Sequence, residues 1–183
     1  AITRRGETLP GLVFTPGGPV EGALSMLAGG TMIAVGDNHG SVGVYKSKNG
    51  EPVFREIREL PDGSVRAMRA IALSPNGNLL ASLAVDGLIR LWDLTEGTRV
   101  SAWKGFGGRS LSFDAQGERL LCLTSEGNPC LVDLRSQVSQ PLEQLQSPAH
   151  TVCFSRDNTL VVCAGNAVLS LLRVADGSLV ASF

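Results

Sequence analysis

The sequence contains few aromatic residues, few charged residues and no long apolar run. Aromatic residues make up 5% and charged residues 18% of the 183 residues. No stretch of about 18 uncharged apolar residues occurs, so the sequence predicts no membrane-spanning helix. Lys and Arg number 16 against 17 Asp and Glu, which gives a formal net charge of -1. This balance argues against nucleic acid or an acidic membrane surface as the partner.

Cysteine is scarce, and its spacing does not match a metal site. No Cys-x-x-Cys pair occurs, and the chain has only 2 histidines. Most of the cysteines lie in apolar runs, so we expect buried, reduced thiols and no bound metal or cofactor. Reduced thiols favour a cytoplasmic or nuclear location over a secreted one. The four positions are Cys122, Cys130, Cys153 and Cys163.

Glycine is abundant, with 22 residues, and it marks an internal repeat. Aligning Gly77 with Gly30 matches the two surrounding segments without a gap. Gly117 takes the same place in a third copy, and Asn158 replaces the glycine in a fourth. A period of about 40 to 47 residues is typical of repeats built from supersecondary units. The sequence therefore predicts four similar units.

Each unit predicts four short strands. Three apolar segments and a fourth, weaker one are separated by turns that contain glycine, asparagine or aspartate. Asp86-Gly87 between alternating apolar residues indicates a hairpin, because a type I′ turn needs positive φ at both central residues. No segment of about ten residues has helical periodicity, so we predict an all-β fold. The equivalent two-residue turns are His39-Gly40, Glu126-Gly127 and Gly165-Asn166.

Units of four antiparallel strands repeated along a chain form the blades of a β-propeller. The segment ALSPNGNLLASLAVDGLIRLWDL, residues 72–94, resembles a repeat of the WD-repeat family, and the match is strongest in residues 70–103. The resemblance implies a non-catalytic protein-protein interaction scaffold within a multi-subunit assembly, with no cofactor. The partners it implies are therefore proteins.

The sequence also departs from the family pattern. In WD repeats a His, a Ser or Thr, the turn Asp and the Trp form a hydrogen-bonded network. Here Ser82, Asp86 and Trp92 are present, and the His is missing. We therefore expect blades held together mainly by apolar packing, with Trp92 between two of them.

The repeats divide the chain into one continuous propeller domain or segment. We assign blade 1 to residues 23–57, blade 2 to 65–104, blade 3 to 108–146 and blade 4 to 149–183. Residues 1–22 are expected to give the outer strand of a preceding blade plus a connection. This count favours part of a larger propeller. A four-bladed ring, and a half-ring that self-associates through its open blade edges, stay open as alternatives.

Antiparallel topology brings the turns between second and third strands to the same rim as the connections between blades. Recognition residues concentrate in such loops. The arginines of the longest connection suit an acidic or phosphorylated peptide, which they would bind through bidentate hydrogen bonds. The segment GFGGRS, residues 105–110, is expected to be another connection. The candidate partner-binding residues on this rim are His39, Arg58, Arg66, Arg69, Asp86, Glu126 and Asn166.

Catalysis is not expected, because G-x-S-x-G, H-E-x-x-H and P-loop motifs are all missing. One alternative is a propeller that binds a small ligand, or hydrolyses a substrate, in its central channel. That site would need polar residues on the innermost strands, and the segments AIAL, SLSF and TVCF offer almost none. Nucleic-acid binding through the arginines is a second alternative, which the net charge disfavours.

Overall fold

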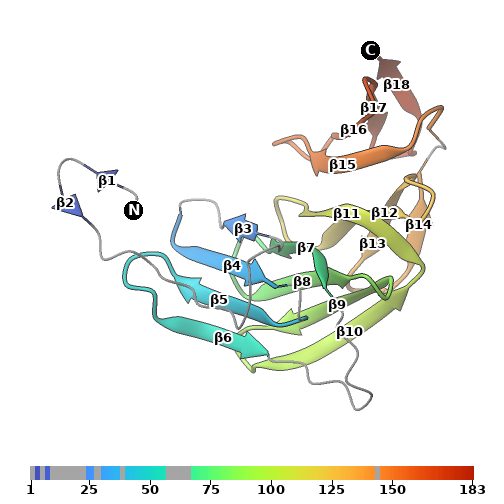
Figure 1. The fold of residues 1–183 in the computed structure, drawn as a ribbon. Helices are drawn as coiled ribbons and strands as arrows, with labels where there is room; N and C mark the ends of the chain where they lie inside the picture. Colours follow the sequence, from blue (N-terminus) through green and yellow to red (C-terminus); the bar gives the residue numbers. More distant parts are fainter. Residues whose placement is uncertain are drawn as a thin grey trace.

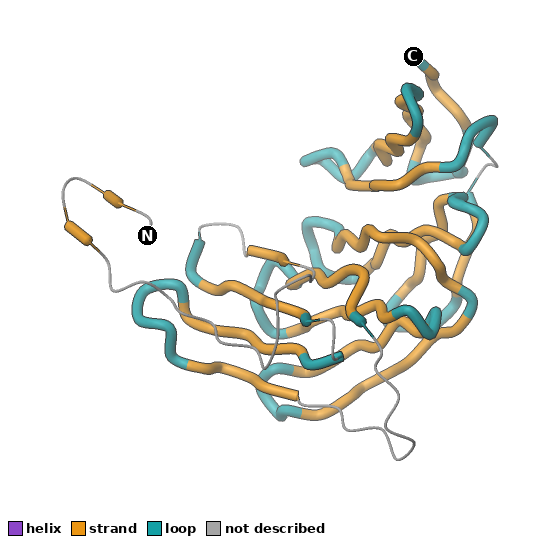
Figure 2. The backbone as a smooth tube through the Cα atoms, viewed as in Figure 1, coloured by secondary structure: helices purple, strands orange, loops and turns teal. Residues whose placement is uncertain are grey.

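The computed structural model describes residues 3–4, 7–8, 24–26, 30–37, 40–56, 67–142 and 145–183. Within these ranges the backbone forms strands and turns, and no helix is present (Figure 2). Four antiparallel sheets of four strands follow one another along the chain (Figure 1). This confirms the predicted all-β fold of propeller blades.

Each sheet is a blade whose strands pair in chain order. Blade 1 consists of β3 (Leu24–Met26), β4 (Met32–Gly36), β5 (Val42–Lys46) and β6 (Pro52–Glu56). Blade 2 consists of β7 (Met68–Leu73), β8 (Leu79–Ala84), β9 (Leu88–Asp93) and β10 (Thr98–Lys104). Blade 3 consists of β11 (Phe106–Phe113), β12 (Arg119–Thr124), β13 (Pro129–Asp133) and β14 (Ser139–Pro141). Blade 4 consists of β15 (Ala149–Phe154), β16 (Leu160–Gly165), β17 (Leu169–Arg173) and β18 (Leu179–Ser182).

The N-terminal segment pairs with itself. Strands β1 (Thr3–Arg4) and β2 (Glu7–Thr8) form a two-stranded antiparallel sheet, which lies apart from the blades in Figure 1. The apolar residues expected to form the outer strand of a preceding blade, 9–14, lie outside the described residues. The assignment of residues 1–22 to that strand therefore stays a prediction.

The blades pack face to face because both faces of their strands are apolar. In β8, Leu80 and Ala84 belong to the core shared with blade 1, whereas Ala81 and Leu83 belong to the core shared with blade 3. Such two-sided burial explains why the inner strands read as nearly continuous apolar runs. A third core between blades 3 and 4 contains Leu121 of β12. The first strands β7, β11 and β15 lie next to one another and form the inner side of the arc of blades.

The turns between first and second strands share one hydrogen-bonding pattern in blades 2, 3 and 4. Ser74, Asp114 and Ser155 each accept a hydrogen bond from the backbone N–H that starts the next strand or lies one residue before it. The left-handed residue of each turn is Gly77, Gly117 or Asn158, and Asn158 has a φ of 58°. Asparagine tolerates this conformation better than other non-glycine residues. The replacement of the turn glycine by Asn158 therefore preserves the turn.

The hairpin turn of blade 4 differs from the predicted one. We expected Gly165-Asn166 at the turn, but Gly165 is the last residue of β16, and its N–H donates to the Val168 carbonyl. The two turn residues are therefore Asn166 and Ala167, and Ala167 has a φ of 61°. A left-handed alanine places its Cβ close to the following carbonyl oxygen, so this turn carries local strain.

We expect Ala167→Gly to stabilise the protein. The substitution removes the left-handed strain and adds a smaller entropic cost in the unfolded chain, so the free energy of unfolding should rise by about 0.5–1 kcal/mol. Urea unfolding followed by circular dichroism measures the change. Ala164→Gly, in regular β16, is the matched control and should lower stability by about 0.5–1 kcal/mol. Destabilisation by both variants would contradict the strain at Ala167.

Aspartates cap several of the turns that join first to second strands or third to fourth strands, which lie on one rim of the blades. The Thr95 hydroxyl donates to Asp93 at 2.6 Å, and the Ser178 hydroxyl donates to Asp176 at 2.7 Å. These hydrogen bonds, together with backbone N–H donors, hold the pKa of both carboxyl groups below its usual range. The same causes lower the pKa of two further carboxyl groups, Asp133 and Asp157.

Stability should therefore fall in acid. A carboxyl group whose pKa is lowered by folding stabilises the fold above its unfolded pKa, which is about 4. The contribution is lost as the pH falls through the lower folded pKa. We expect the midpoint of urea unfolding to fall as the pH is lowered from about 5 to about 2, the range over which these carboxyl groups become protonated. Asp176→Asn should reduce the slope of this dependence, and an unchanged slope would contradict the role of its cap.

Candidate functional site

The turns between the second and third strands of each blade, called here the hairpin turns, lie on the same rim as the starts of the inner strands. We call this rim the binding rim. Hydrogen bonds join the two sets of segments: Met68 N–H donates to Asp37 O, and Ala149 N–H donates to Gly127 O. The bonds measure 2.9 and 3.0 Å. Connections between blades therefore lie against the hairpin turns, as the topology predicted.

The inner strands β7, β11 and β15 are each bulged at the binding rim. The pairing register shifts at Arg69 in β7, between Phe106 and Leu111 in β11, and at His150 in β15. A bulge leaves the extra residue outside the ladder and turns its side chain outward. Arg69, Arg109 and His150 are accordingly exposed. We call these three residues the inner arc.

Hydrogen bonds between neighbouring inner strands hold the bulges in place. The Arg69 guanidinium donates to the Gly107 carbonyl at 2.8 Å, which joins β7 to β11. Ser110 accepts from Val152 N–H and donates to the Val152 carbonyl, each at 3.1 Å, which joins β11 to β15. These contacts give the inner arc a fixed backbone.

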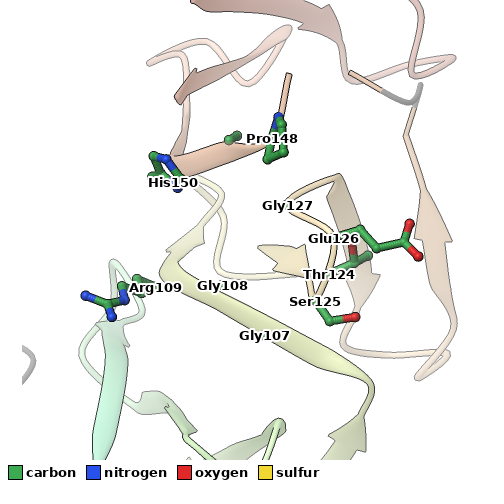
Figure 3. A pocket seen from close by; sticks show the side chains of 10 residues that line it. Gly107, Gly108, Arg109, Thr124, Ser125, Glu126, Gly127, Pro148 and His150 are labelled. Atoms are coloured by element: carbon green, nitrogen blue, oxygen red, sulfur yellow. The ribbon is translucent and has the colours of Figure 1, made fainter. Parts of the chain in front are cut away.

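A pocket of about 270 Å³ opens beside the inner arc, between blades 3 and 4. Its walls are the bulge of β11, the hairpin turn of blade 3 and the start of β15 (Figure 3). The Arg109 and Glu126 side chains leave opposite sides of the pocket and point away from each other in Figure 3. Neither forms an ion pair or a side-chain hydrogen bond with the part of the chain that the structure describes.

Two glycines make this close packing possible. A Cβ on Gly165 would lie 2.2 Å from the Pro148 carbonyl oxygen, and a Cβ on Gly108 would lie 2.4 Å from the Leu123 Cβ. No side chain fits at these distances. The glycines therefore let the blade connection and the bulge of β11 approach the neighbouring strands.

The structure describes four of the seven predicted rim residues. Arg69 is exposed in the bulge of β7, and Glu126 lines the pocket. Asn166 is exposed, and its Oδ1 lies 3.0 Å from Nε2 of His150. The other three, His39, Arg58 and Arg66, lie outside the described residues.

The remaining predicted residue, Asp86, is bound within its own blade. It pairs with Arg90 through a bidentate contact of 2.5 and 3.2 Å, and both side chains are 5% exposed. Its Oδ1 also accepts the Leu88 N–H at 3.0 Å. The carboxylate is therefore not presented to a partner, and we leave Asp86 out of the binding surface.

Sequence reasoning missed Arg109 and His150. Segment 105–110 was expected to be a connection, but β11 begins at Phe106 and contains most of it. The inner strands therefore start before the segments SLSF and TVCF, and their first residues carry the polar groups that those segments lack. The expectation of almost no polar residues on the innermost strands was wrong. The glycines of GFGGRS were the available signal, because glycine within a strand often marks a bulge.

Part of the family's hydrogen-bonded network is present around Trp92. Trp92 Nε1 donates to the Ser82 hydroxyl at 3.1 Å, and its ring lies 5.8 Å from the Phe54 ring of blade 1. Trp92 is 3% exposed in the core between blades 1 and 2. In the family network the turn Asp would bind the His, which is missing here. The Asp86 carboxylate pairs with Arg90 instead.

Three cysteines are buried as expected, and one is not. Hydrogen bonding to Cys130, together with burial, raises the pKa of Cys122, and burial raises the pKa of Cys163 to about 12. Cys153 is exposed, and the expectation of burial was wrong there. Val152 of the same strand faces the core with blade 3, so strand alternation turns Cys153 to the opposite face.

Two further classes of site are missing from the described ranges. No group of three or more metal-ligating side chains occurs there. None of the described segments is a helix long and apolar enough to span a membrane.

Comparisons with known proteins agree with the geometry. Residues 55–93 match the family model described as WD domain, G-beta repeat. The chain is 22% identical over 109 residues to eukaryotic translation initiation factor 3 subunit I of Debaryomyces hansenii, covering 58% of this chain and 31% of that protein. A chain in the crystal structure of a mitotic checkpoint complex has a TM-score of 0.74 at 16% identity. That match covers 88% of this chain and 49% of the other, so the chain spans half or less of each relative.

Proposed function

We propose that this chain, a WD-repeat protein built of β-propeller blades, is a non-catalytic scaffold that binds other proteins within a larger assembly. Two similarities support the proposal. One relative is named a subunit of a translation initiation factor, and the structural relative belongs to a checkpoint complex. The four free cysteines, three of them buried, support a cytoplasmic or nuclear location.

The binding rim is the surface that we assign to this function. The observation that carries the assignment is the bulge at the start of the first strands of blades 2, 3 and 4, which turns Arg69, Arg109 and His150 outward. Bulges that aim side chains are common next to functional sites. Exposed polar side chains on a rigid scaffold are well suited to recognition.

Binding is favoured over catalysis, and protein over small ligand. His150, the histidine among the described residues, lies against the Asn166 amide rather than a nucleophile or a carboxylate. The pocket of about 270 Å³ lies at the small end of the sites that bind small molecules, which measure about 300–1,000 Å³. The open rim around it suits an extended polypeptide better than an enclosed ligand.

We also propose that the four blades are part of a larger propeller. Leu169 and Val180 of blade 4 are 39% and 43% exposed, although the inner blades bury both of their faces. A neighbouring blade would cover Leu169, as the existing blades cover one another. The domain limits proposed from the sequence fit this arrangement: 23–57, 65–104, 108–146 and 149–183. Self-association of two copies is the alternative.

Site-specific photo-cross-linking tests the binding rim. A photoreactive phenylalanine analogue at position 126 or 166 lies on the rim, whereas position 96 or 176 lies on the opposite side of the blades. We expect cross-links to partner proteins from the first pair and not from the second. Cross-links confined to positions 96 and 176 would overturn the assignment of the rim.

A further inference from the structure

The inner strands at the binding rim carry positive charge without any acidic residue. Strands β7, β11 and β15 contain the sequences MRAIAL, FGGRSLSF and AHTVCF, with two arginines, one histidine and no Asp or Glu. The whole chain has a formal net charge of -1. The starts of these strands therefore present two arginines and no carboxylate on a protein that is slightly acidic as a whole.

The two arginines keep their hydrogen-bonding capacity. Arg69 uses one guanidinium nitrogen to bind the Gly107 carbonyl, which fixes the side chain and leaves its remaining donors available. Arg109 is exposed and has no ion-pair partner among the described residues. By contrast, Arg90 and Arg119 lie beside the carboxylates of Asp86 and Asp114. Arg69 and Arg109 are thus available for a ligand.

Both arginines meet at the same stretch of backbone. Arg69 binds Gly107, and Gly107 and Arg109 line the same pocket. A Cβ on Gly107 would lie 2.7 Å from the Ser125 Cα, so this stretch packs tightly against the hairpin turn of blade 3 and supports the bulge that carries the exposed Arg109. Glu126 lies on the other side of the pocket and points away from Arg109 (Figure 3). The charges across the pocket are therefore segregated rather than neutralised.

We propose that the inner arc binds an acidic segment of a partner protein, with carboxylate side chains held by Arg69 and Arg109. This inference rests on the proposed function of the binding rim and names the chemistry of its partner. Guanidinium groups recognise carboxylates through paired, charge-assisted hydrogen bonds. Glu126 opposes the same ligand and sets the direction in which the acidic residues lie.

Fluorescence anisotropy with labelled hexaglutamate as the probe tests the proposal on the intact chain at low salt. We expect Arg69→Gln and Arg109→Gln each to weaken binding about three- to fivefold, as for exposed ion pairs. Glu126→Gln should strengthen binding about twofold, because it removes a repelling charge. Arg156→Gln, an exposed arginine in a turn on the opposite rim, is the matched control and should have no effect.

Several outcomes would overturn the proposal. Equal binding of hexalysine, or equal loss with Arg156→Gln, would show non-specific attraction. Displacement by inorganic phosphate at concentrations where acetate has no effect would assign the arc to phosphoryl groups instead of carboxylates. Position 126 could cross-link to a partner that binds both arginine variants with the same affinity as it binds the wild type. In that case the acidic-segment proposal fails and the proposed rim stands. Hexaglutamate binding without any rim cross-link would instead contradict the proposed function.

Discussion

Trp92→Ala should lower the free energy of unfolding by about 3–5 kcal/mol, the range for removing a large aromatic side chain from a packed core. Trp92 is 3% exposed and fills the core between blades 1 and 2. The substitution removes its contact with the Phe54 ring and leaves the buried Ser82 hydroxyl without the indole donor. Urea unfolding monitored by circular dichroism measures the loss.

Two further variants separate the contributions. Trp92→Phe keeps most of the buried ring area and loses the hydrogen bond, so it should cost about 1–2 kcal/mol. Trp103→Ala removes a tryptophan that is only partly buried on β10, with a longer bond of 3.4 Å to the Gln137 carbonyl. Its cost should be clearly smaller than that of Trp92→Ala. Equal losses at the two tryptophans would contradict the role of Trp92 as the packing centre between blades.

The blades could be predicted because their signals are local. Asp86-Gly87 and Glu126-Gly127 mark hairpins whose geometry depends on a few neighbouring residues, and both glycines have positive φ. The predicted type I′ geometry was wrong, because Asp86 and Glu126 do not have positive φ, and each glycine instead ends a turn in which its N–H donates to the carbonyl three residues earlier. Apolar runs between such turns can then only be strands. Asn158 preserves its turn for the same local reason, so the weakest repeat could still be aligned.

The details of the fourth blade depend on interactions that no local pattern contains. Gly165 lies at the end of β16 rather than in the turn, and it is a glycine because the Pro148 carbonyl packs where a side chain would be. The left-handed conformation falls on Ala167, although alanine gives no sign of it in the sequence. Cys153 sits in an apolar run, and its exposure depends on which face of β15 meets blade 3.

The binding rim was predicted from topology, and its individual residues were predicted less well. Strand alternation assigns side chains to faces, but a bulge shifts that assignment at Arg69 and His150. These bulges form where an inner strand meets its neighbouring blade, through contacts such as that of Arg69 with Gly107. Asp86 shows the reverse case, because its place in a hairpin turn suggested an exposed carboxylate and Arg90 buries it.

The pair of Asp86 and Arg90 leads to the second large expected effect. Asp86→Ala should lower the free energy of unfolding by about 3–5 kcal/mol, because it leaves a buried guanidinium without its counter-charge. Arg90 is 4% exposed, and its Nε already has no hydrogen-bond partner among the described residues. The remaining contact of Arg90 with the Leu88 carbonyl is 3.4 Å long and cannot replace the carboxylate.

A double-mutant cycle distinguishes the pair from the loss of either side chain alone. Asp86→Ala combined with Arg90→Met removes both charges and keeps apolar volume, so the double variant should be more stable than Asp86→Ala by about 1–4 kcal/mol. The exposed pair of Lys46 and Glu51, 58% and 59% exposed at 3.0 Å, is the control. Glu51→Ala should cost less than about 1 kcal/mol. A double variant no more stable than Asp86→Ala would mean that the carboxylate acts through the Leu88 N–H in the hairpin turn rather than through the buried ion pair.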